Sequence, residues 1–478
     1  MKLNEFCKLL NLPVQKQNSI IENITINSKE VKENSIFIAL KGKKFDGNSY
    51  INDAFKRGAL IVLSDNKERS EHHSQIFYIA NLPLKLGEIA GLFYGAIPNN
   101  IIAVTGTNGK SSVVDFAMQL FVKLNYDAAT IGTMGFYYNN KLLKQLANTT
   151  PDILSLYKYL SSLDKKHCHN VLFEASSHGI TQGRIANIPI QIAVFTNLTQ
   201  DHLDYHHDME NYFAAKAKLF ANYLAGNGIA IVNADSNYAV KLKAICDLRG
   251  IKYFDFGKNA EHLKIIEYDE KNITIKYQNK IYQIPWHLKG EFQIYNIICA
   301  ISILLNSAIN LENIISQTAS IMPVKGRLEE IKVTKEYKVF IDYAHTPSAL
   351  ENALCSLRPY VSGKLILVFG CGGERDQQKR PLMGQVAEKY SDYIIVTDDN
   401  PRNEDADNIR SDILANISNA KEIAGRKTAI LHALNIVESG DVILIAGKGH
   451  EDYQIIGDNK QDFNDAQIVK ELIAECGQ

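Results

Sequence analysis

The stretch Ala103-Val-Thr-Gly-Thr-Asn-Gly-Lys-Ser-Ser112 joins an apolar run to a segment with helical spacing. The apolar residues Ile101–Val104 predict a buried strand, and a helix is predicted to begin at Lys110. Gly106 and Gly109 lie in the turn between them. Backbone N–H groups in such a turn and at a helix N-terminus form a concave site for phosphate. The order of strand, glycine turn and helix therefore predicts a nucleotide-binding α/β domain.

Two side chains after the turn support this interpretation. Lys110 supplies a mobile positive charge, and the hydroxyl of Ser111 is placed to bind Mg²⁺. The spacing is a variant, because Val104 stands where the usual phosphate loop has its first glycine. A Gly-Lys-Ser tripeptide alone is often an ordinary helix start, so the prediction depends on the preceding strand and the two glycines.

Length and composition are those of a multidomain globular protein. A chain of 478 residues is too long for one core, and usual domain sizes suggest about three domains. Its 52 basic and 53 acidic residues give a net charge of −1, which draws it neither to nucleic acid nor to an anionic membrane. No apolar run approaches the roughly 18 residues of a membrane span, and we expect no signal peptide and no membrane insertion.

The cysteines indicate a reducing compartment. Seven are scattered along the chain without a Cys-x-x-Cys pair, which predicts free thiols and a cytoplasmic protein. Cys168 lies between His167 and His169, the one local cluster that suggests a metal. We expect a surface loop there, because no second cluster completes a zinc site.

The pattern of strands and helices divides the chain at about residues 87 and 325. In 1–87, Ser35–Leu40 and Ala59–Leu63 predict buried strands, with helices at 48–57 and 83–94. In 88–325, four apolar runs alternate with helical segments, which predicts a parallel sheet covered on both faces. Residues 264–284 predict short antiparallel strands, and a long helix is expected over 292–308.

Residues 326–478 predict a second doubly wound α/β domain. Its expected strands are 339–342, 364–369, 393–397 and 442–446. Polar clusters follow each of them, beginning at Asp342, Gly370, Asp398 and Gly447. Ligands of open α/β sheets bind beyond the carboxyl ends of the strands, and mixed arginines and carboxylates there suit a zwitterion. A structural salt-bridge network is the alternative.

Two further clusters follow strands of the central region. Glu174 ends the run Val171–Phe173 and is placed to hold Mg²⁺ with Ser111, unless it is only a solvated loop acid. The segment Asn197–Asp208 contains three histidines and three aspartates after a strand. These could form the site of a zinc hydrolase, but a role around ATP and Mg²⁺ is more economical beside a nucleotide loop. We expect His202 to be the metal-side residue and the remaining two histidines, His206 and His207, to be exposed.

Taken together, these motifs resemble those of the Mur ligases over nearly the whole chain and in the expected order. The matching motifs are Thr105-Gly-Thr-Asn-Gly-Lys110, Glu174-Ala-Ser-Ser-His-Gly179, Thr196-Asn-Leu-Thr-Gln-Asp-His-Leu-Asp-Tyr-His206, Gly326-Arg-Leu-Glu329, Asp342-Tyr-Ala-His-Thr-Pro347 and Ala446-Gly-Lys-Gly-His-Glu-Asp452. The resemblance implies an N-terminal α/β uridine-binding domain, a central P-loop-type parallel sheet with a small antiparallel sheet, and a C-terminal Rossmann-like domain. Their boundaries would be 1–87, 88–325 and 326–478.

The resemblance also implies the reaction and its machinery. It is an ATP-dependent amide synthesis through an acyl phosphate, in which an amino acid is added to UDP-N-acetylmuramoyl-L-alanyl-D-glutamate for peptidoglycan. Lys110, Glu174, His202 and Lys216 would be catalytic, with Mg²⁺ held by Ser111, Glu174, His202 and Lys216 as its carbamate. ATP would contact Gly106, Thr107, Asn108, Gly109, Lys110, Ser111, Ser112, Asn296, Arg327 and Asp342. Ser111-Ser112 stands where relatives usually show Thr-Thr, and the hydroxyl remains.

The remaining residues implied by the resemblance bind the other substrates. For the UDP-muramyl dipeptide they are Ile26, Ser28, Lys43, Lys44, Phe45, Asn148, Thr149, Thr150, Ser176, Gln182 and Arg184. Asp399-Asn-Pro-Arg402 resembles the family's signature for meso-diaminopimelate. Contacts to that amino acid would come from Arg375, Asp399, Asn400, Pro401, Arg402, Gly447 and Glu451. We expect a monomer.

Three alternatives remain at this point. A folylpolyglutamate synthetase would share the nucleotide core but would lack the Asp399–Arg402 motif and this type of N-terminal domain. A nucleotide-gated regulatory protein without catalysis would be favoured by missing Glu174, Lys216 or His202, and all of these residues are present. A zinc hydrolase is the third.

Overall fold

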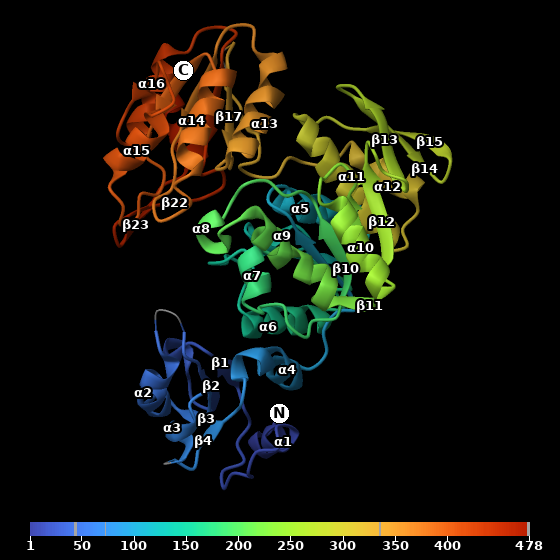
Figure 1. The fold of residues 1–478 in the computed structure, drawn as a ribbon, viewed down its shortest axis with the longest axis vertical. Helices are drawn as coiled ribbons and strands as arrows, with labels where there is room; N and C mark the ends of the chain where they lie inside the picture. Colours follow the sequence, from blue (N-terminus) through green and yellow to red (C-terminus); the bar gives the residue numbers. More distant parts are fainter. Residues whose placement is uncertain (43–44, 72, 334–335, 476–478) are drawn as a thin grey trace. The chain divides into compact units, whose positions relative to one another are not determined.

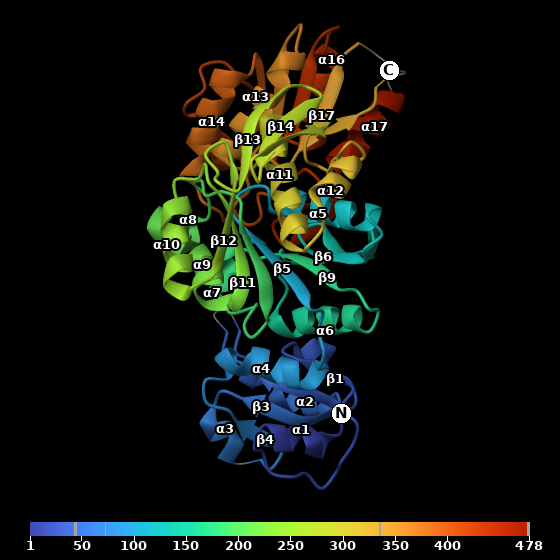
Figure 2. The ribbon, with the colours of Figure 1, turned by 90° about the vertical axis from the view of Figure 1, so that its right-hand side faces the viewer.

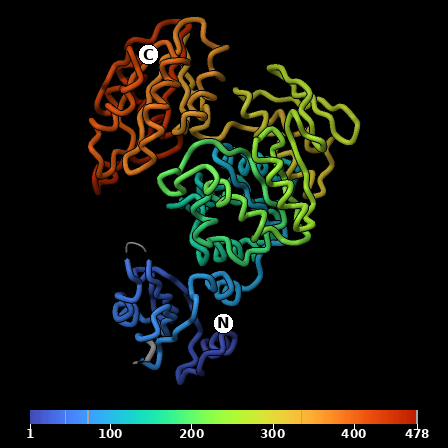
Figure 3. The backbone as a smooth tube through the Cα atoms, in the orientation of Figure 1, coloured from blue at the N-terminus to red at the C-terminus, as the bar shows by residue number. Residues whose placement is uncertain are grey.

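The computed structural model describes residues 1–42, 45–71, 73–333 and 336–475. They form two compact units. Figure 1 shows their helices and strands with the labels used below. The first unit contains Met1–Ala103, Asp127–Gln191 and Ala221–Ala225, and the second contains Val104–Tyr126, Ile192–Phe220 and Gly226–Gln478. Because each unit is assembled from separate stretches of chain, the backbone passes between them more than once (Figure 3).

The N-terminal part of the first unit is a small parallel sheet. Its strands lie in the order β1 (Asn23–Thr25), β2 (Ser35–Ala39), β3 (Ala59–Ser64) and β4 (Ile76–Tyr78). Every residue of β2 and β3 is buried, as expected for parallel strands with both faces covered. Its helices are α1 (Leu3–Leu9), α2 (Ile51–Lys56), α3 (Lys67–Glu71) and α4 (Leu82–Tyr94), with 3-10 turns at Ser28–Glu30 and Gly47–Tyr50. The strands and helices predicted for this region are confirmed, with α2 shorter than expected.

The first unit also contains a mixed sheet, of which the sequence predicted only the strand at Val171–Glu174. Its strands β9 (Asn170–Glu174), β6 (Ala128–Gly132), β7 (Gly135–Tyr138) and β8 (Lys141–Lys144) lie side by side in that order. β6 and β9 are parallel, whereas β7 and β8 form an antiparallel hairpin. Asn139 and Asn140 have φ angles of 48° and 62°, which suit the tight turn of this hairpin. The helices α6 (Ile153–Asp164) and α7 (Ser177–Thr181) complete this part.

The central part of the second unit follows the predicted alternation of strand and helix. Strands β10 (Ile190–Phe195), β11 (Leu224–Asn233), β12 (Lys252–Gly257), β13 (Leu263–Tyr268), β14 (Asn272–Tyr277) and β15 (Lys280–Pro285) lie side by side in chain order. β11 to β13 are parallel, and β13 to β15 are antiparallel, which confirms the expectation for 264–284.

The helices of this part all come after β5 (Asn100–Thr105) in the chain. They are α5 (Lys110–Lys123), α8 (Leu203–His206), α9 (Met209–Lys218), α10 (Ala239–Arg249), α11 (Glu291–Asn306) and α12 (Leu311–Thr318). α11 packs along α5, the helix of the phosphate loop. Helix α9 continues directly into a π-helical turn at Leu219–Tyr223, which leads into β11.

The C-terminal part of the second unit is the predicted doubly wound sheet. Its order is β16 (Glu329–Ile331), β17 (Lys338–Asp342), β21 (Val442–Ala446), β18 (Leu365–Phe369), β19 (Tyr393–Val396) and β20 (Lys421–Glu422). All pairs are parallel except β16 with β17. A hairpin of β22 (Tyr453–Ile456) and β23 (Asn459–Asp462) follows β21.

Helices cover both faces of this C-terminal sheet (Figure 2). Apolar residues of α13 (Pro347–Leu357), α14 (Lys379–Tyr390) and α15 (Ala406–Leu414) pack on one face, and those of α16 (Arg426–Ile436) and α17 (Asp465–Glu475) pack on the other. The fold class is therefore confirmed as α/β with parallel sheets and a small antiparallel one. Among the helices of the described residues, none is both long and apolar enough to cross a membrane.

The surface loop predicted around Cys168 is confirmed, since both neighbouring histidines, His167 and His169, are exposed. The Cys168 side chain itself points into the core, with 1% exposed. Its thiol donates to the carbonyl oxygen of Asn170, and burial raises the thiol pKa to about 12. Because it is buried, this thiol is a packed side chain of the core.

Candidate functional site

The glycine turn after β5 is held in shape by the segment that follows β10. The amide of Asn108 donates to the side-chain oxygen of Asn197 at 2.9 Å, and the Thr196 hydroxyl donates to the carbonyl of Asn108 at 2.7 Å. Gly109 has a φ of 84°, and a Cβ there would lie 2.5 Å from the Asn296 side chain. Only glycine fits at this position, so the turn and α11 approach closely.

Two lysines converge on the same turn. Lys110 Nζ donates to the carbonyl oxygens of Gly106 and Thr107 at 3.0 and 2.8 Å. Lys216, on α9, donates to the same Gly106 oxygen at 2.8 Å and lies over the Tyr212 ring at 4.6 Å. Burial and the neighbouring Lys110 charge lower the pKa of Lys216 well below its usual value. The resemblance implies a catalytic role for Lys216, and the structure shows that its side chain is buried.

Asp201 organises the segment that contains His202. Its carboxylate lies 3.4 Å from His202 Nε2, 3.7 Å from His345 Nε2 and 3.9 Å from Lys379 Nζ. Burial alone would raise the pKa of Asp201, but the hydrogen bond from His345 and the charges of His202 and Lys379 bring it well below its usual range. Sequence reasoning did not assign a role to Asp201, His345 or Lys379, although Asp201 and His345 lie in motifs that it quoted.

The prediction that His206 and His207 are exposed is confirmed for His207 and wrong for His206. His207 is exposed, but His206 is buried, with its ring 5.1 Å from that of Tyr212. The aromatic neighbour on α9 provides an apolar surface that the polar sequence around His206 does not reveal. His206 is therefore part of the packing that supports α9.

Glu174, in the first unit, is buried and ordered by its neighbours. Its carboxylate accepts from the amide and the hydroxyl of Thr133 at 2.8 and 3.1 Å. A Cβ at Gly132 would lie 2.3 Å from the Glu174 carboxylate, so the glycine leaves space for this side chain. The interpretation as a solvated loop acid is wrong, because only 1% of the residue is exposed.

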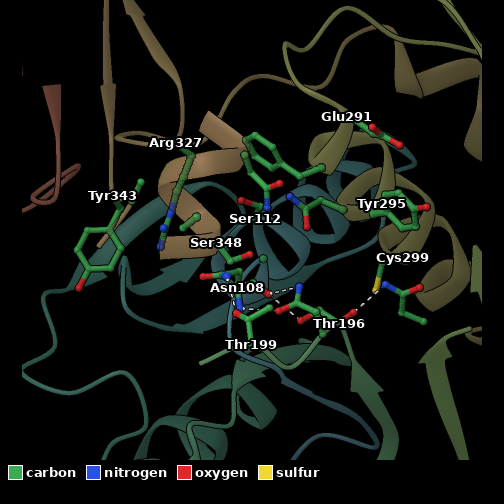
Figure 4. Close-up of a pocket in the computed structure, with 18 of the residues that line it drawn as sticks. Asn108, Ser112, Thr196, Thr199, Glu291, Tyr295, Cys299, Arg327, Tyr343 and Ser348 are labelled. Atoms are coloured by element: carbon green, nitrogen blue, oxygen red, sulfur yellow. Dashed lines mark hydrogen bonds between the residues drawn. The ribbon is translucent and has the colours of Figure 1, made fainter. Parts of the chain in front are cut away.

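A cavity of about 310 Å³ opens beside the phosphate turn in the second unit (Figure 4). Its lining includes several residues that the sequence assigned to ATP, namely Asn108, Gly109, Ser112, Asn296, Arg327 and Asp342. Asn233, Phe256, Tyr295, Cys299 and Tyr343 also line it and were not predicted. The mixture of aromatic, apolar and amide side chains suits a nucleoside.

The C-terminal part contributes Arg327 and Asp342 to the lining of this cavity. The Arg327 guanidinium lies 4.6 Å from the centre of the Tyr343 ring and donates to the Ser111 hydroxyl at 3.3 Å. Asp342 accepts from the Leu328 amide at 2.7 Å. Burial raises the pKa of Asp342 to about 6, although Arg327 and backbone hydrogen bonds oppose the shift.

The residues predicted to bind the amino acid gather at the carboxyl edge of the C-terminal sheet. Asn400 Nδ2 donates to Glu451 at 2.9 Å, and a Cβ at Gly447 would lie 2.6 Å from the Asp399 carboxylate. Arg402 donates to the Gly373 carbonyl at 2.7 Å. Burial and the nearby charge of Arg375 lower the pKa of Arg402, whereas the carboxylates Asp399 and Glu451 oppose the shift.

Lys448 is a further member of this cluster that the prediction omitted. It is fully buried and lies 3.1 Å from the Glu451 carboxylate and 3.4 Å from the Asn400 side-chain oxygen. Pro401 is buried between Asn400 and Arg402. Arginines, a lysine and carboxylates thus meet in one place, as the zwitterion hypothesis requires.

Part of the predicted sugar-peptide site also forms a cluster, within the first unit. Arg184 donates to the Thr150 carbonyl at 2.7 Å and to the Gln182 side chain at 2.6 Å. The hydroxyls of Thr150 and Ser176 lie 3.0 Å apart. Thr149 is bonded to Thr133, and Asn148 is exposed. Ile26 and Phe45 lie on loops of the N-terminal sheet, where Phe45 is 72% exposed, and Ser28 begins the 3-10 turn Ser28–Glu30. Lys43 and Lys44 lie outside the described residues.

Comparison with known families and proteins agrees with this arrangement. Three family models match in order: the Mur ligase family catalytic domain over 20–94, the Mur ligase middle domain over 104–304, and the Mur ligase glutamate ligase domain over 326–449. The chain therefore belongs to the Mur ligase family, whose members carry out ATP-dependent amide ligation. It is a ligase, which excludes the non-catalytic and zinc-hydrolase alternatives.

Individual proteins show which enzymes this chain resembles along its length. A protein of Rickettsia montanensis, 42% identical with 98% of both chains covered, is named UDP-N-acetylmuramoyl-L-alanyl-D-glutamate--2,6-diaminopimelate ligase. A protein of Agrobacterium fabrum with the same name is 37% identical over 99% of this chain and 97% of its own. A solved structure with this name is 30% identical and has a TM-score of 0.69, and the match covers 100% of both chains. A Mycobacterium tuberculosis folylpolyglutamate synthase shares the fold, at 16% identity and a TM-score of 0.61, with 77% of this chain and 92% of its own covered.

Proposed function

We propose that this protein joins meso-2,6-diaminopimelate to UDP-N-acetylmuramoyl-L-alanyl-D-glutamate, with conversion of ATP to ADP and phosphate. The observation that carries the proposal is the charged cluster at the edge of the C-terminal sheet. In this cluster, the charges of Arg375, Asp399 and Glu451 lie close enough to Arg402 to shift its pKa. Diaminopimelate has two amino-acid ends, so it requires both cationic and anionic partners. Relatives along the full chain are named for this substrate.

The proposed reaction begins with phosphoryl transfer. The D-glutamate side-chain carboxylate attacks the γ-phosphorus of ATP, which gives an acyl phosphate and ADP. Lys110 and the amides of the glycine turn would stabilise the negative charge that accumulates between the two anions. The amine of the amino acid then attacks the acyl carbon, and the tetrahedral intermediate expels phosphate. Water must be excluded in the meantime, because it would hydrolyse the acyl phosphate.

We assign Mg²⁺ to Ser111, His202 and Glu174 from the family resemblance and from the chemistry of their side chains. Ser111 and His202 offer oxygen and nitrogen ligands, and Glu174 offers a buried carboxylate. The lowered pKa of Lys216 favours a neutral amine, which is the form that adds CO₂ to give a carbamate. That carbamate would supply a further anionic oxygen ligand, and the ion would neutralise phosphate charge when bound. Asp201 would hold His202, through its contact at 3.4 Å.

The other substrates are assigned to the remaining clusters. ATP would occupy the cavity lined by Asn296, Arg327 and Asp342, with its phosphates at the glycine turn. The UDP-muramyl dipeptide would bind Thr150, Ser176, Gln182 and Arg184 together with loops of the N-terminal sheet. We assign these roles to domains at 1–87, 88–325 and 326–478. We also propose a cytoplasmic monomer.

A phosphate-release assay tests the proposal. Purified protein is given ATP, Mg²⁺ and UDP-N-acetylmuramoyl-L-alanyl-D-glutamate, with meso-diaminopimelate, lysine or ornithine as the acceptor. We expect release that depends on the nucleotide substrate and is fastest with diaminopimelate. Faster turnover of lysine would overturn the assignment of the amino acid.

A further inference from the structure

Two loops at the edge of the C-terminal sheet carry the arginines of the amino-acid site. The first, Gly372–Gln377, follows β18 and contains Arg375, and the second, Asp399–Glu404, follows β19 and contains Arg402. The loops touch through their backbones, since the Gly373 amide donates to the Asn400 carbonyl at 2.9 Å. A Cβ at Gly373 would lie 1.9 Å from the Pro401 carbonyl oxygen. A small displacement of either loop would therefore move both arginines.

One carboxylate connects these loops to the core. Glu404 accepts from the two terminal nitrogens of Arg380 at 2.6 and 2.8 Å, and it also accepts from the Glu374 amide at 2.9 Å and the Gln377 side chain at 3.2 Å. Arg380, on α14, is fully buried and reaches the Gly372 carbonyl at 3.4 Å. A bidentate arginine–carboxylate pair fixes direction as well as distance. The pair thus binds both loops to one helix.

We propose that Glu404 is a positioning residue that sets the preference for an acceptor with a second carboxylate, an inference that rests on the proposed function. Arg375 repels Arg402, whereas Asp399 and Glu451 attract it, so the position of each arginine in the unliganded site depends on how firmly its loop is held. Glu404 lies outside this charged cluster and fixes both loops to α14 through its bonds to Arg380, Glu374 and Gln377. An acceptor with a second carboxylate benefits from two aligned guanidinium groups, whereas lysine has no group to place there.

The variant Glu404→Gln tests this inference. It keeps the size of the side chain, but its amide nitrogen cannot accept from Arg380 or from the Glu374 amide. Residues that orient a ligand-binding group typically contribute about 10- to 100-fold. We expect the KM for diaminopimelate to rise about tenfold or more, with kcat at saturation and the KM for ATP close to wild type. The ratio of kcat/KM for diaminopimelate to kcat/KM for lysine should therefore fall.

Asp412→Asn is the matched control. Asp412 also binds Arg380, at 2.9 Å, but it lies on α15 and is 49% exposed. This variant removes a carboxylate from the same arginine without touching either loop, so its KM for diaminopimelate should stay at the wild-type value. An equal rise in the two variants would contradict the positioning role, as would an equal rise in the KM for ATP.

The outcomes separate this inference from the proposed function. Wild-type protein that preferred lysine would overturn both. Wild-type protein that preferred diaminopimelate, with a Glu404→Gln variant that kept the same preference, would overturn only the role of Glu404. If Glu404→Gln failed to fold, Gln377→Ala would remove one of the hydrogen bonds to Glu404. Its KM for diaminopimelate should then rise about two- to tenfold, and an unchanged value would contradict the inference.

Discussion

Lys216 Nζ lies 2.8 Å from the carbonyl oxygen of Gly106, in the turn that is predicted to hold the phosphates of ATP. Lys110 donates to the same oxygen at 3.0 Å. Two ammonium groups on one acceptor repel each other, and the buried Lys216 is the one whose pKa is lowered well below its usual value. A neutral amine beside the phosphate turn suits conversion to a carbamate, which would replace a repelled cation by an anion that binds metal.

This relationship predicts the behaviour of Lys216→Ala. The variant should lose most of its activity, because no anionic ligand replaces the carbamate. Formate or acetate should restore part of the activity by occupying the space that the side chain leaves. The measurement is phosphate release with and without each added carboxylate. Lys218→Ala, which changes an exposed lysine on the same helix, should behave like wild type. Full activity of untreated Lys216→Ala would exclude the carbamate role.

Much of the fold was predictable because buried parallel strands are continuous apolar runs. β2, β3, β18 and β21 are such runs, and every residue in them is buried. β8 was missed for the opposite reason, since each residue of Lys141–Lys144 is exposed and no apolar alternation marks it. The two adjacent asparagines of the β7–β8 turn, Asn139 and Asn140, were the local sign of a tight hairpin turn.

The site was less predictable where it depends on packing between distant segments. Glu174 and Lys216 stand in recognisable motifs, but their burial depends on Gly132, Tyr212 and the glycine turn. The proximity of Asp201 to Lys379 has no local signal, because Asp201 lies on the loop after β10 and Lys379 begins α14, far along the chain. Local composition therefore predicted which residues carry charge, and tertiary contacts decided which of those charges are buried.

Arg402→Ala should severely impair the use of diaminopimelate. Loss of a partner for a buried carboxylate typically costs about 2–5 kcal/mol, which corresponds to about 30- to 5000-fold in kcat/KM. Turnover of lysine, which lacks that carboxylate, should change much less. Initial rates with the two acceptors measure the difference. Arg358→Ala removes an exposed ion pair with Asp392 elsewhere in the same domain, and it should leave both rates unchanged. An Arg402→Ala enzyme with the wild-type preference would contradict the assignment.

Gly132→Ala should reduce activity by displacing Glu174. The new Cβ would lie 2.3 Å from one carboxylate oxygen, so the Glu174 side chain must move and its bonds to Thr133 must weaken. A displacement of about 1 Å at a reacting site costs on the order of 100-fold in rate. The lost hydrogen bonds cost about 1 kcal/mol each in stability, so the variant should still fold.

The comparison variant is Gly226→Ala. No atom lies within 4 Å of the position that its Cβ would take, so its activity and its free energy of unfolding should stay near wild type. Kinetic assays and denaturant unfolding of both variants make the test. Gly132→Ala with wild-type kcat would show that the position of Glu174 does not matter for turnover.

Asp342→Asn should change how stability depends on pH. Burial, opposed by Arg327, raises the pKa of Asp342 from 3.8 to about 6 in the folded protein. Between these values the folded state binds more protons than the unfolded state, so the contribution of Asp342 to stability falls as pH rises. This contribution is complete below pH 3.8 and is lost by about pH 6, with a total change of about 3 kcal/mol. Asparagine does not titrate and lacks the effect.

The quantity to measure is the free energy of unfolding of wild type minus that of Asp342→Asn, at pH values from 4 to 7. The difference should fall with increasing pH up to about 6 and then level off, because other titrating groups contribute equally to both proteins. The affinity for ADP should follow the opposite course, since an ionised Asp342 is the better acceptor for ligand hydroxyls in the cavity. A stability difference that rose with pH would mean that Arg327 outweighs burial, and Asp342 would then be ionised throughout this range.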